Sequence, residues 1–187
     1  NPHASGIHQV PHIQTAQDRG GKLVVIDPRR TALAKRADHH LAIYPGSDLV
    51  VALAMIRWLN QHGFTDQDFI HQHTTGFDQL IERAERWTLS EAASIARVTE
   101  SSLEAIFRVY GESSPAVIRC GWGPERNRNG GSATAAILAI PAVANKFTRS
   151  GGFTMSNSGS WRLNQASVIQ ETPPESRSIN MNLIGET

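Results

Sequence analysis

The sequence has little of several features that mark common classes of protein. It contains one cysteine, Cys120, which excludes an internal disulfide framework, a cysteine-held zinc site and an iron–sulfur cluster within these residues. Lys and Arg total 18 against 17 for Asp and Glu, and the net charge of +1 indicates neither a nucleic-acid surface nor an anionic-membrane surface. No apolar run approaches the ~20 residues that a membrane helix needs. We expect a soluble chain, cytoplasmic or periplasmic, with no nucleic-acid partner and no membrane insertion.

Common catalytic and metal-binding motifs are missing as well. The eight histidines include no H-E-x-x-H pair, and neither a G-x-S-x-G nor a G-x-x-x-x-G-K-[S/T] pattern occurs. No G-x-G-x-x-G precedes the first expected strand, so an ordinary nicotinamide or flavin site is poorly supported. Cys120 is expected to lie buried at a strand end without an activating neighbour. We predict no metal ligand and no catalytic residue within the chain.

The pattern of apolar residues predicts one α/β domain in these 187 residues. Leu23 to Ile26 is a short apolar run rich in β-branched side chains, which is typical of a strand covered on both faces in a parallel sheet. Further strands are expected at 41–43 and 116–119. Periodicity and end signals predict helices at 7–19, 31–37, 49–62, 77–86, 90–97, 101–110 and 132–147, with 64–111 as a helical stretch without strands.

The order of these elements predicts a mainly parallel sheet flanked by helices, with a Rossmann-like dinucleotide-binding topology. From Ser150 on, Gly, Ser, Asn and Pro are frequent, and we expect irregular structure there. We divide the chain into a binding domain at 1–152 and an irregular tail at 153–187 that leads to a following domain. Because the chain starts without methionine and ends in polar residues, we expect it to be part of a longer protein.

Asp27 follows the first expected strand and is the first candidate site residue. Ligands of open α/β sheets gather at the carboxyl ends of strands, where a carboxylate can accept hydrogen bonds from ribose hydroxyls. Arg29 and Arg30 come next and offer bidentate donors to a phosphate. The alternative is a plain strand end with surface arginines, and the spacing alone does not separate the two.

The turn Pro45-Gly46-Ser47-Asp48 is the second candidate. From the local sequence, the first interpretation of Asp48 is that it is the N-cap of the helix that follows. Such a cap contributes roughly 1 kcal/mol to the stability of a helix. A carboxylate held there can also accept from the adjacent N–H and NH2 groups of a guanine edge. The two roles compete for the same oxygens.

The third candidate is the glycine-rich loop from Gly121 to Gly131. Its glycines allow a ligand to approach the backbone, and Arg126 and Arg128 place charge just before a helix amino terminus, which favours phosphate. The alternative is a mobile surface loop.

These motifs, taken in one order along nearly the whole chain, resemble the molybdopterin oxidoreductases of the dimethyl sulfoxide reductase family. The family pattern has a strand ending in Gly-Ser-Asn-Pro, an Ile-Asp-Pro-Arg strand, a Pro-Gly-Ser/Thr-Asp turn and a Gly-x-Gly loop with a basic residue. The matching segments here are Asn1-Pro2, Ile26 to Arg29, Pro45 to Asp48 and Gly121 to Gly130, and the tail SRSINMNLIGE is similar to family sequence as well.

The resemblance implies a domain that helps to bind one of two molybdopterin guanine dinucleotides, which together hold molybdenum or tungsten. It implies Asp48 for the guanine, with Gly46 and Ser47 in the same turn, and Asp27 and Arg29 for the guanosine. Asn1 is implied near the pterin and pyrophosphate. The residues implied to line the side nearer the pterin are Gly121, Trp122, Gly123, Glu125 and Arg126.

The chain also departs from the family pattern. The metal ligand (Ser, Cys or selenocysteine) and any iron–sulfur cysteines are expected upstream of Asn1, and Glu125 stands where many relatives have glutamine. We therefore expect the chain alone to be inactive and to bind no metal. The expected partners of the parent enzyme are the rest of its polypeptide, an electron-transfer subunit and a small-molecule substrate. The rival readings are a stand-alone guanine-nucleotide module and a purely structural interaction domain.

Overall fold

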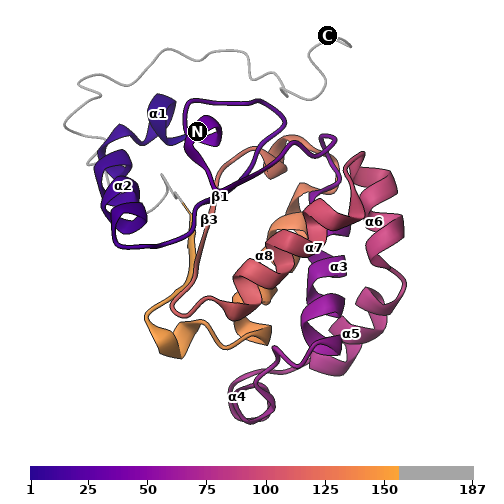
Figure 1. Ribbon diagram of the computed structural model, residues 1–187. Coiled ribbons are helices and arrows are strands. Elements are labelled where there is room, and N and C mark those ends of the chain that lie inside the picture. Colours follow the sequence, from indigo (N-terminus) through magenta and orange to yellow (C-terminus); the bar gives the residue numbers. More distant parts are fainter. Residues whose placement is uncertain (156–187) are drawn as a thin grey trace, which may run out of the picture. The chain divides into compact units, whose positions relative to one another are not determined.

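The computed structural model describes residues 1–155 (Figure 1). The strands are β1 (Val24–Ile26), β2 (His39–Leu41), β3 (Val117–Cys120) and β4 (Gly152–Met155). The α-helices are α1 (Pro2–Ser5), α2 (Val10–Asp18), α3 (Asp48–Gln61), α4 (Gln67–His73), α5 (Phe77–Glu85), α6 (Leu89–Ala96), α7 (Glu100–Glu112) and α8 (Gly130–Val143). Short 3-10 turns are η1 (Ile7–Gln9), η2 (Ala34–Arg36), η3 (Pro124–Arg126) and η4 (Phe147–Arg149). None of the helices in this part is long and apolar enough to cross a membrane.

The described strands form two parallel pairs. β1 pairs with β2 in the register Val24 to His39, and β3 pairs with β4 in the register Val117 to Gly152. Parallel pairing requires a crossover connection, which contains η2 between β1 and β2, and η3, α8 and η4 between β3 and β4. Helices α3 to α7 separate the two pairs in the sequence. This arrangement confirms the predicted α/β class with parallel strands and flanking helices.

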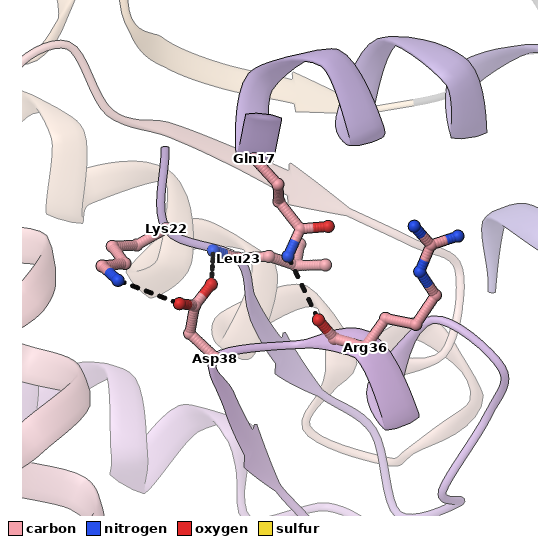
Figure 2. Close-up of polar contacts among 5 residues, drawn as sticks. All are labelled: Gln17, Lys22, Leu23, Arg36 and Asp38. Atoms are coloured by element: carbon pink, nitrogen blue, oxygen red, sulfur yellow. Dashed lines mark hydrogen bonds and ion pairs between the residues drawn. The ribbon is translucent and has the colours of Figure 1, made fainter. Parts of the chain in front are cut away.

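Asp38 fixes the start of the β1–β2 pair, as Figure 2 shows. Its carboxylate accepts from the backbone N–H of Leu23 at 2.9 Å and from Lys22 Nζ at 3.1 Å, while its own N–H donates to the Leu23 carbonyl at 2.9 Å. Nearby, Gln17 Nε2 of α2 donates to the carbonyl of Arg36 at 3.1 Å. The hydrogen bond from Leu23, followed by Lys22, lowers the pKa of Asp38.

Asp38→Asn is therefore expected to lower the free energy of unfolding at pH 7. Because the pKa of Asp38 is lowered in the folded chain, its contribution is present above the unfolded pKa and is lost as the pH falls through the folded pKa. Urea denaturation of both proteins at pH 7 and pH 3 tests this, with Asp18→Asn as the control for an exposed aspartate. An equal loss of stability at the two pH values would contradict the prediction.

The hydrophobic core is built around α3. Nine of its residues, Val50 to Ile56 with Trp58 and Leu59, are buried, because four helices pack around it. α3 contacts α8, α6 and α5 most extensively, and Figure 1 shows these helices grouped together. The Trp58 ring stacks on His62 with centroids 4.0 Å apart and tilts against Phe107 of α7 at 6.2 Å.

Lys146 joins the end of α7 to the segment after α8. Its buried Nζ donates to the carbonyls of Gly111 at 3.0 Å and Ser113 at 2.7 Å, and it lies 5.5 Å from the centroid of the Tyr110 ring. Burial lowers the pKa of this amine. The contact orders the chain between α7 and β3, which leads into the glycine-rich loop.

Four predicted helices, at 49–62, 77–86, 90–97 and 101–110, are confirmed within one or two residues at each end. The helix predicted at 132–147 is α8, which ends four residues earlier, at Val143. Pro11 lies in the first turn of α2, the Thr99 hydroxyl caps α7, and Gly63, two residues after the end of α3, has a left-handed conformation (φ 73°). Cys120 is buried at the end of β3 as expected. The predicted helix at 31–37 is reduced to η2, and the predicted helix at 7–19 is divided into η1 and α2.

Other predictions are wrong in the described part. β1 is not covered on both faces, because Ile26 is 47% exposed. The second strand lies at His39–Leu41 rather than 41–43, because it pairs in register with β1. α4 was not foreseen, although Asp66 caps it by accepting from the Phe69 N–H at 2.9 Å. β4 forms where irregular structure was expected, since β3 supplies its partner. β4 also lies across the boundary at 152, and the division into two domains stays a prediction. The predicted tail beyond residue 155 lies outside the described residues.

Candidate functional site

The turn between β2 and α3 is held tightly by its own backbone and by Ser47. The Ser47 N–H and Oγ both donate to the Tyr44 carbonyl, at 3.1 Å and 2.6 Å. Gly46 has φ 89°, a left-handed conformation that a side chain would strain. Ser47 is only 3% exposed although it is polar, so its hydroxyl serves the shape of the turn.

Asp48 is the first residue of α3 and not its N-cap, which corrects the local reading of the sequence. Ser47 occupies the N-cap position, and no side chain makes the capping hydrogen bond. Within residues 1–155 no side chain donates to the half-buried Asp48 carboxylate, and burial raises its pKa, opposed by the N–H groups of Asp48 and Gly46. Asp48 therefore does not cap α3, and its carboxylate can accept from a ligand in addition to these backbone N–H groups.

The glycine-rich loop meets this turn directly. Asn129 Nδ2 donates to the Gly46 carbonyl at 3.0 Å, across 83 positions of sequence. A Cβ added at Gly46 would also lie 3.3 Å from Asn127 Oδ1. The second and third candidate motifs are thus parts of one site.

The negative charges of Glu125 and Asp48 act on the Cys120 thiol. Burial raises the pKa of the Cys120 thiol, and the charges of Asp48 and Glu125 raise it further, while Arg119 lowers it. A thiol held protonated in this way does not act as a nucleophile. The negative charge here favours a ligand that offers N–H donors.

The start of α8 leaves room beside the loop. Its N-cap, Asn129, makes no capping hydrogen bond because its side chain is directed to Gly46. A Cβ built at Gly121, Gly123 or Gly131 would meet no atom of residues 1–155 within 4 Å. The uncapped N–H groups of a helix amino terminus attract anionic oxygens, so the loop offers both space and donors.

Asp27 and Arg29 lie at the same carboxyl edge as the turn, because β1 and β2 are parallel neighbours. One Asp27 oxygen accepts from the Arg29 N–H at 2.8 Å, and the Asp27 carbonyl lies 2.9 Å from His40 Nε2. This local turn leaves the other carboxylate oxygen available to a ligand. The Arg29 side chain is exposed.

The remaining candidates are Trp122, Arg126 and Asn1. Trp122 is 43% exposed, and Arg126 ends η3 on the surface. The Asn1 carbonyl accepts from the N–H groups of Ala4 and Ser5, and among residues 1–155 no hydrogen bond joins Asn1 to the other candidates. The described residues contain no group of three or more His, Cys, Asp or Glu arranged to hold a metal.

Three residues of this region escaped the reasoning from sequence. Asn127 and Asn129 contact the turn, and Asn129 stands just before two glycines that open a helix, which was a usable signal. Arg97 lies over the ring of Tyr44, with its guanidinium carbon 4.0 Å from the ring centroid. No sequence pattern indicates a contact between positions 44 and 97.

Known proteins resemble this chain in sequence and in fold. A sequence model of the family "molybdopterin oxidoreductase" matches residues 6–184. The probable oxidoreductase YoaE of Bacillus subtilis is 30% identical over 191 residues, which cover 99% of this chain and 28% of that protein. The F420-dependent formate dehydrogenase subunit alpha of Methanocaldococcus jannaschii is 31% identical over 139 residues, covering 74% of this chain and 21% of that subunit. The solved structure of acetylene hydratase from Pelobacter acetylenicus has a TM-score of 0.74 at 28% identity, covering 78% of this chain and 20% of its own.

Fold and motifs together define an α/β domain of the kind found in molybdoenzymes. The chain belongs to the molybdopterin oxidoreductase family, the dimethyl sulfoxide reductase family that its motifs resemble. It spans 28% or less of the length of each of these three relatives.

Proposed function

We propose that this domain binds the guanosine and pyrophosphate part of one molybdopterin guanine dinucleotide in a molybdenum- or tungsten-dependent oxidoreductase. The observation that supports this most is the half-buried Asp48 carboxylate, which has a raised pKa and no side-chain donor among residues 1–155. A guanine edge offers two parallel N–H donors that match one carboxylate. Adenine does not offer this pair.

The other candidate residues fit the rest of such a ligand. Asp27 keeps one carboxylate oxygen for a ribose hydroxyl, and Arg29 supplies charge beside it. Gly46 and Ser47 hold the turn, and the open space at Gly121 and Gly123 admits the part of the ligand nearer the pterin. Trp122, Glu125, Arg126 and Asn1 are assigned to that same side.

The roles of the chain are to bind and to orient. The bound cofactor supplies metal-centred electron transfer, which this chain cannot provide with its own residues. Asp48 must be ionised to accept two hydrogen bonds, and guanine N–H groups would offset the cost of its burial. Asn129 keeps the turn and the loop in register, so that the guanine and pyrophosphate subsites keep one spacing.

The activity proposed for the whole protein is that of a molybdopterin-dependent oxidoreductase acting on a small molecule. Formate, an N- or S-oxide, nitrate and a sulfur oxyanion are the candidate substrates, and an electron-transfer subunit is the candidate partner. The isolated chain is proposed to be inactive, because the metal ligand and the second cofactor lobe are assigned to other parts of the polypeptide.

The test is a ligand-detected NMR titration of the 187-residue chain with GDP and with ADP. We expect GDP to bind in preference to ADP, and Asp48→Ala to weaken GDP binding about tenfold or more, because a hydrogen bond to a charged group contributes ~1.5–3 kcal/mol. Asp48→Asn is expected to lose the guanine preference without loss of stability at pH 7. The raised pKa means that the folded state disfavours the charged form, so removing the charge relieves that cost.

Asp78→Asn is the matched control, because Asp78 also lies in the first turn of a helix, at the start of α5. It should bind GDP as the wild type does. Equal affinity for GDP and ADP, or GDP affinity unchanged in both Asp48 variants with the fold intact, would overturn the assignment. A stand-alone nucleotide-binding module would give the same binding result. The two proposals are distinguished by the reading frame of the full-length protein, which should encode a metal ligand if the protein is an enzyme.

A further inference from the structure

Arg97 occupies a backbone position that favours glycine. It ends α6 with φ 57° and ψ 43°, and its N–H donates to the carbonyls of Ala93 and Ser94. Helices commonly end in this left-handed conformation, and glycine is the usual residue because a Cβ is strained there. An arginine at this position makes the folded chain less stable than a glycine would. The contacts of its side chain are therefore expected to compensate for this loss.

The side chain of Arg97 lies on the aromatic ring of Tyr44. The guanidinium carbon is 4.0 Å from the ring centroid, and the Tyr44 N–H donates to the carbonyl of Ala96 at 2.9 Å. Two contacts, one from the backbone and one from the side chain, thus tie the end of α6 to the residue that begins the turn. Since the Tyr44 carbonyl accepts both Ser47 hydrogen bonds, movement of Tyr44 moves the whole turn.

Among residues 1–155, Arg97 forms no ion pair. Within residues 1–155 no carboxylate lies within 4.0 Å of its guanidinium nitrogens. Arg97 is also not among the groups that shift the pKa of Asp48. Any effect of Arg97 on Asp48 must therefore pass through Tyr44 and the turn rather than through direct attraction.

We propose that Arg97 is a positioning residue of the guanosine site, which sets the Tyr44–Asp48 turn by stacking on Tyr44. This inference rests on the proposed function and adds to it a residue from α6. Lysine would not replace arginine well, because a planar guanidinium can stack on an aromatic ring and a lysine ammonium cannot.

Arg97→Gly tests the proposal, because this substitution removes the side chain and also relieves the backbone strain. The thermal midpoint should be equal to that of the wild type or higher, while GDP affinity should fall about two- to fivefold, the range expected for loss of an exposed cation–π contact. A residue with a merely structural role would lower both quantities together. Arg86→Ala is the matched control, since it removes another arginine stack, on Trp87 at 5.0 Å, and should leave GDP affinity unchanged.

Tyr44 variants give the second measurement. Tyr44→Phe keeps the ring and should bind GDP as the wild type does, whereas Tyr44→Ala should lose as much as Arg97→Gly. The double variant Tyr44→Ala with Arg97→Gly should lose no more than either single variant. Guanosine without phosphates should show the same loss as GDP, and a loss confined to GDP would overturn the positioning role in favour of a direct phosphate contact.

The two proposals can fail separately. If the wild type binds GDP selectively through Asp48 but Arg97→Gly binds equally well, the positioning role is wrong and the guanosine site stands. If the wild type shows no preference for GDP over ADP, the guanosine site fails and the role of Arg97 fails with it.

Discussion

Gly130→Ala is expected to disrupt the junction between the glycine-rich loop and α8, and to lower the free energy of unfolding by about 3 kcal/mol. A Cβ at this buried position would lie 2.2 Å from the Pro124 carbonyl oxygen and 2.8 Å from the Glu125 Cα. Both atoms belong to the backbone of η3, so no side-chain rotation can relieve the overlap. Either η3 moves away from α8 or the first turn of α8 unwinds.

Gly131→Ala is the matched control, because it adds the same methyl group one residue later in the same helix. A Cβ there meets nothing within 4 Å. Alanine has the higher helix propensity, so this variant should be neutral or more stable by up to ~1 kcal/mol. Urea denaturation followed by tryptophan fluorescence compares the two. Equal stability of the two variants would show that η3 does not rest on Gly130 as described.

Phe107→Ala is expected to have the largest effect on stability, a loss of about 3–5 kcal/mol. Phe107 is 1% exposed, and its ring lies 6.2 Å from the centroid of Trp58, which joins α7 to the central helix α3. The substitution leaves a cavity between two helices that are held from several sides, so the surroundings cannot collapse into it. With a typical stability of ~5–15 kcal/mol for a domain, such a loss leaves a detectable unfolded population.

Phe107→Leu serves as the control, because it keeps most of the apolar volume, and it should lose only about 1–1.5 kcal/mol. The measurement is chemical denaturation at 25 °C, with Trp58 as one of the reporting fluorophores. A loss below ~1 kcal/mol for Phe107→Ala would mean that α7 repacks on α3 easily, contrary to the close packing described.

The helices were predictable because each carries its own signals. The apolar face of α3, the Thr99 hydroxyl and the left-handed Gly63 are local features that a sequence shows directly. β4 was missed because its residues, Gly152 to Met155, follow a Gly- and Ser-rich segment, and only pairing with the distant β3 makes them a strand. The same pairing rule moved the second strand to His39, opposite Val24.

The candidate site was predictable as a set of motifs but not as an arrangement. The Gly46 turn and the loop were each recognisable, yet the hydrogen bond from Asn129 that joins them spans 83 positions. Local propensity also assigned Asp48 to a capping role that the folded chain does not use. Arg97 carried no signal, since its contact with Tyr44 exists only once α6 ends beside the turn.

The cost of burying Asp48 bears on how long the protein survives in a cell. Without a ligand, folding places a carboxylate where its charged form is disfavoured, and the empty domain is less stable for it. A nucleotide that donates N–H groups to Asp48 binds only the folded chain, so at a concentration 100 times its Kd it adds about 2.7 kcal/mol to the stability. Unloaded molecules would then open more often and be degraded sooner than loaded ones. The side chain proposed to recognise guanine would in this way also couple cofactor supply to protein lifetime.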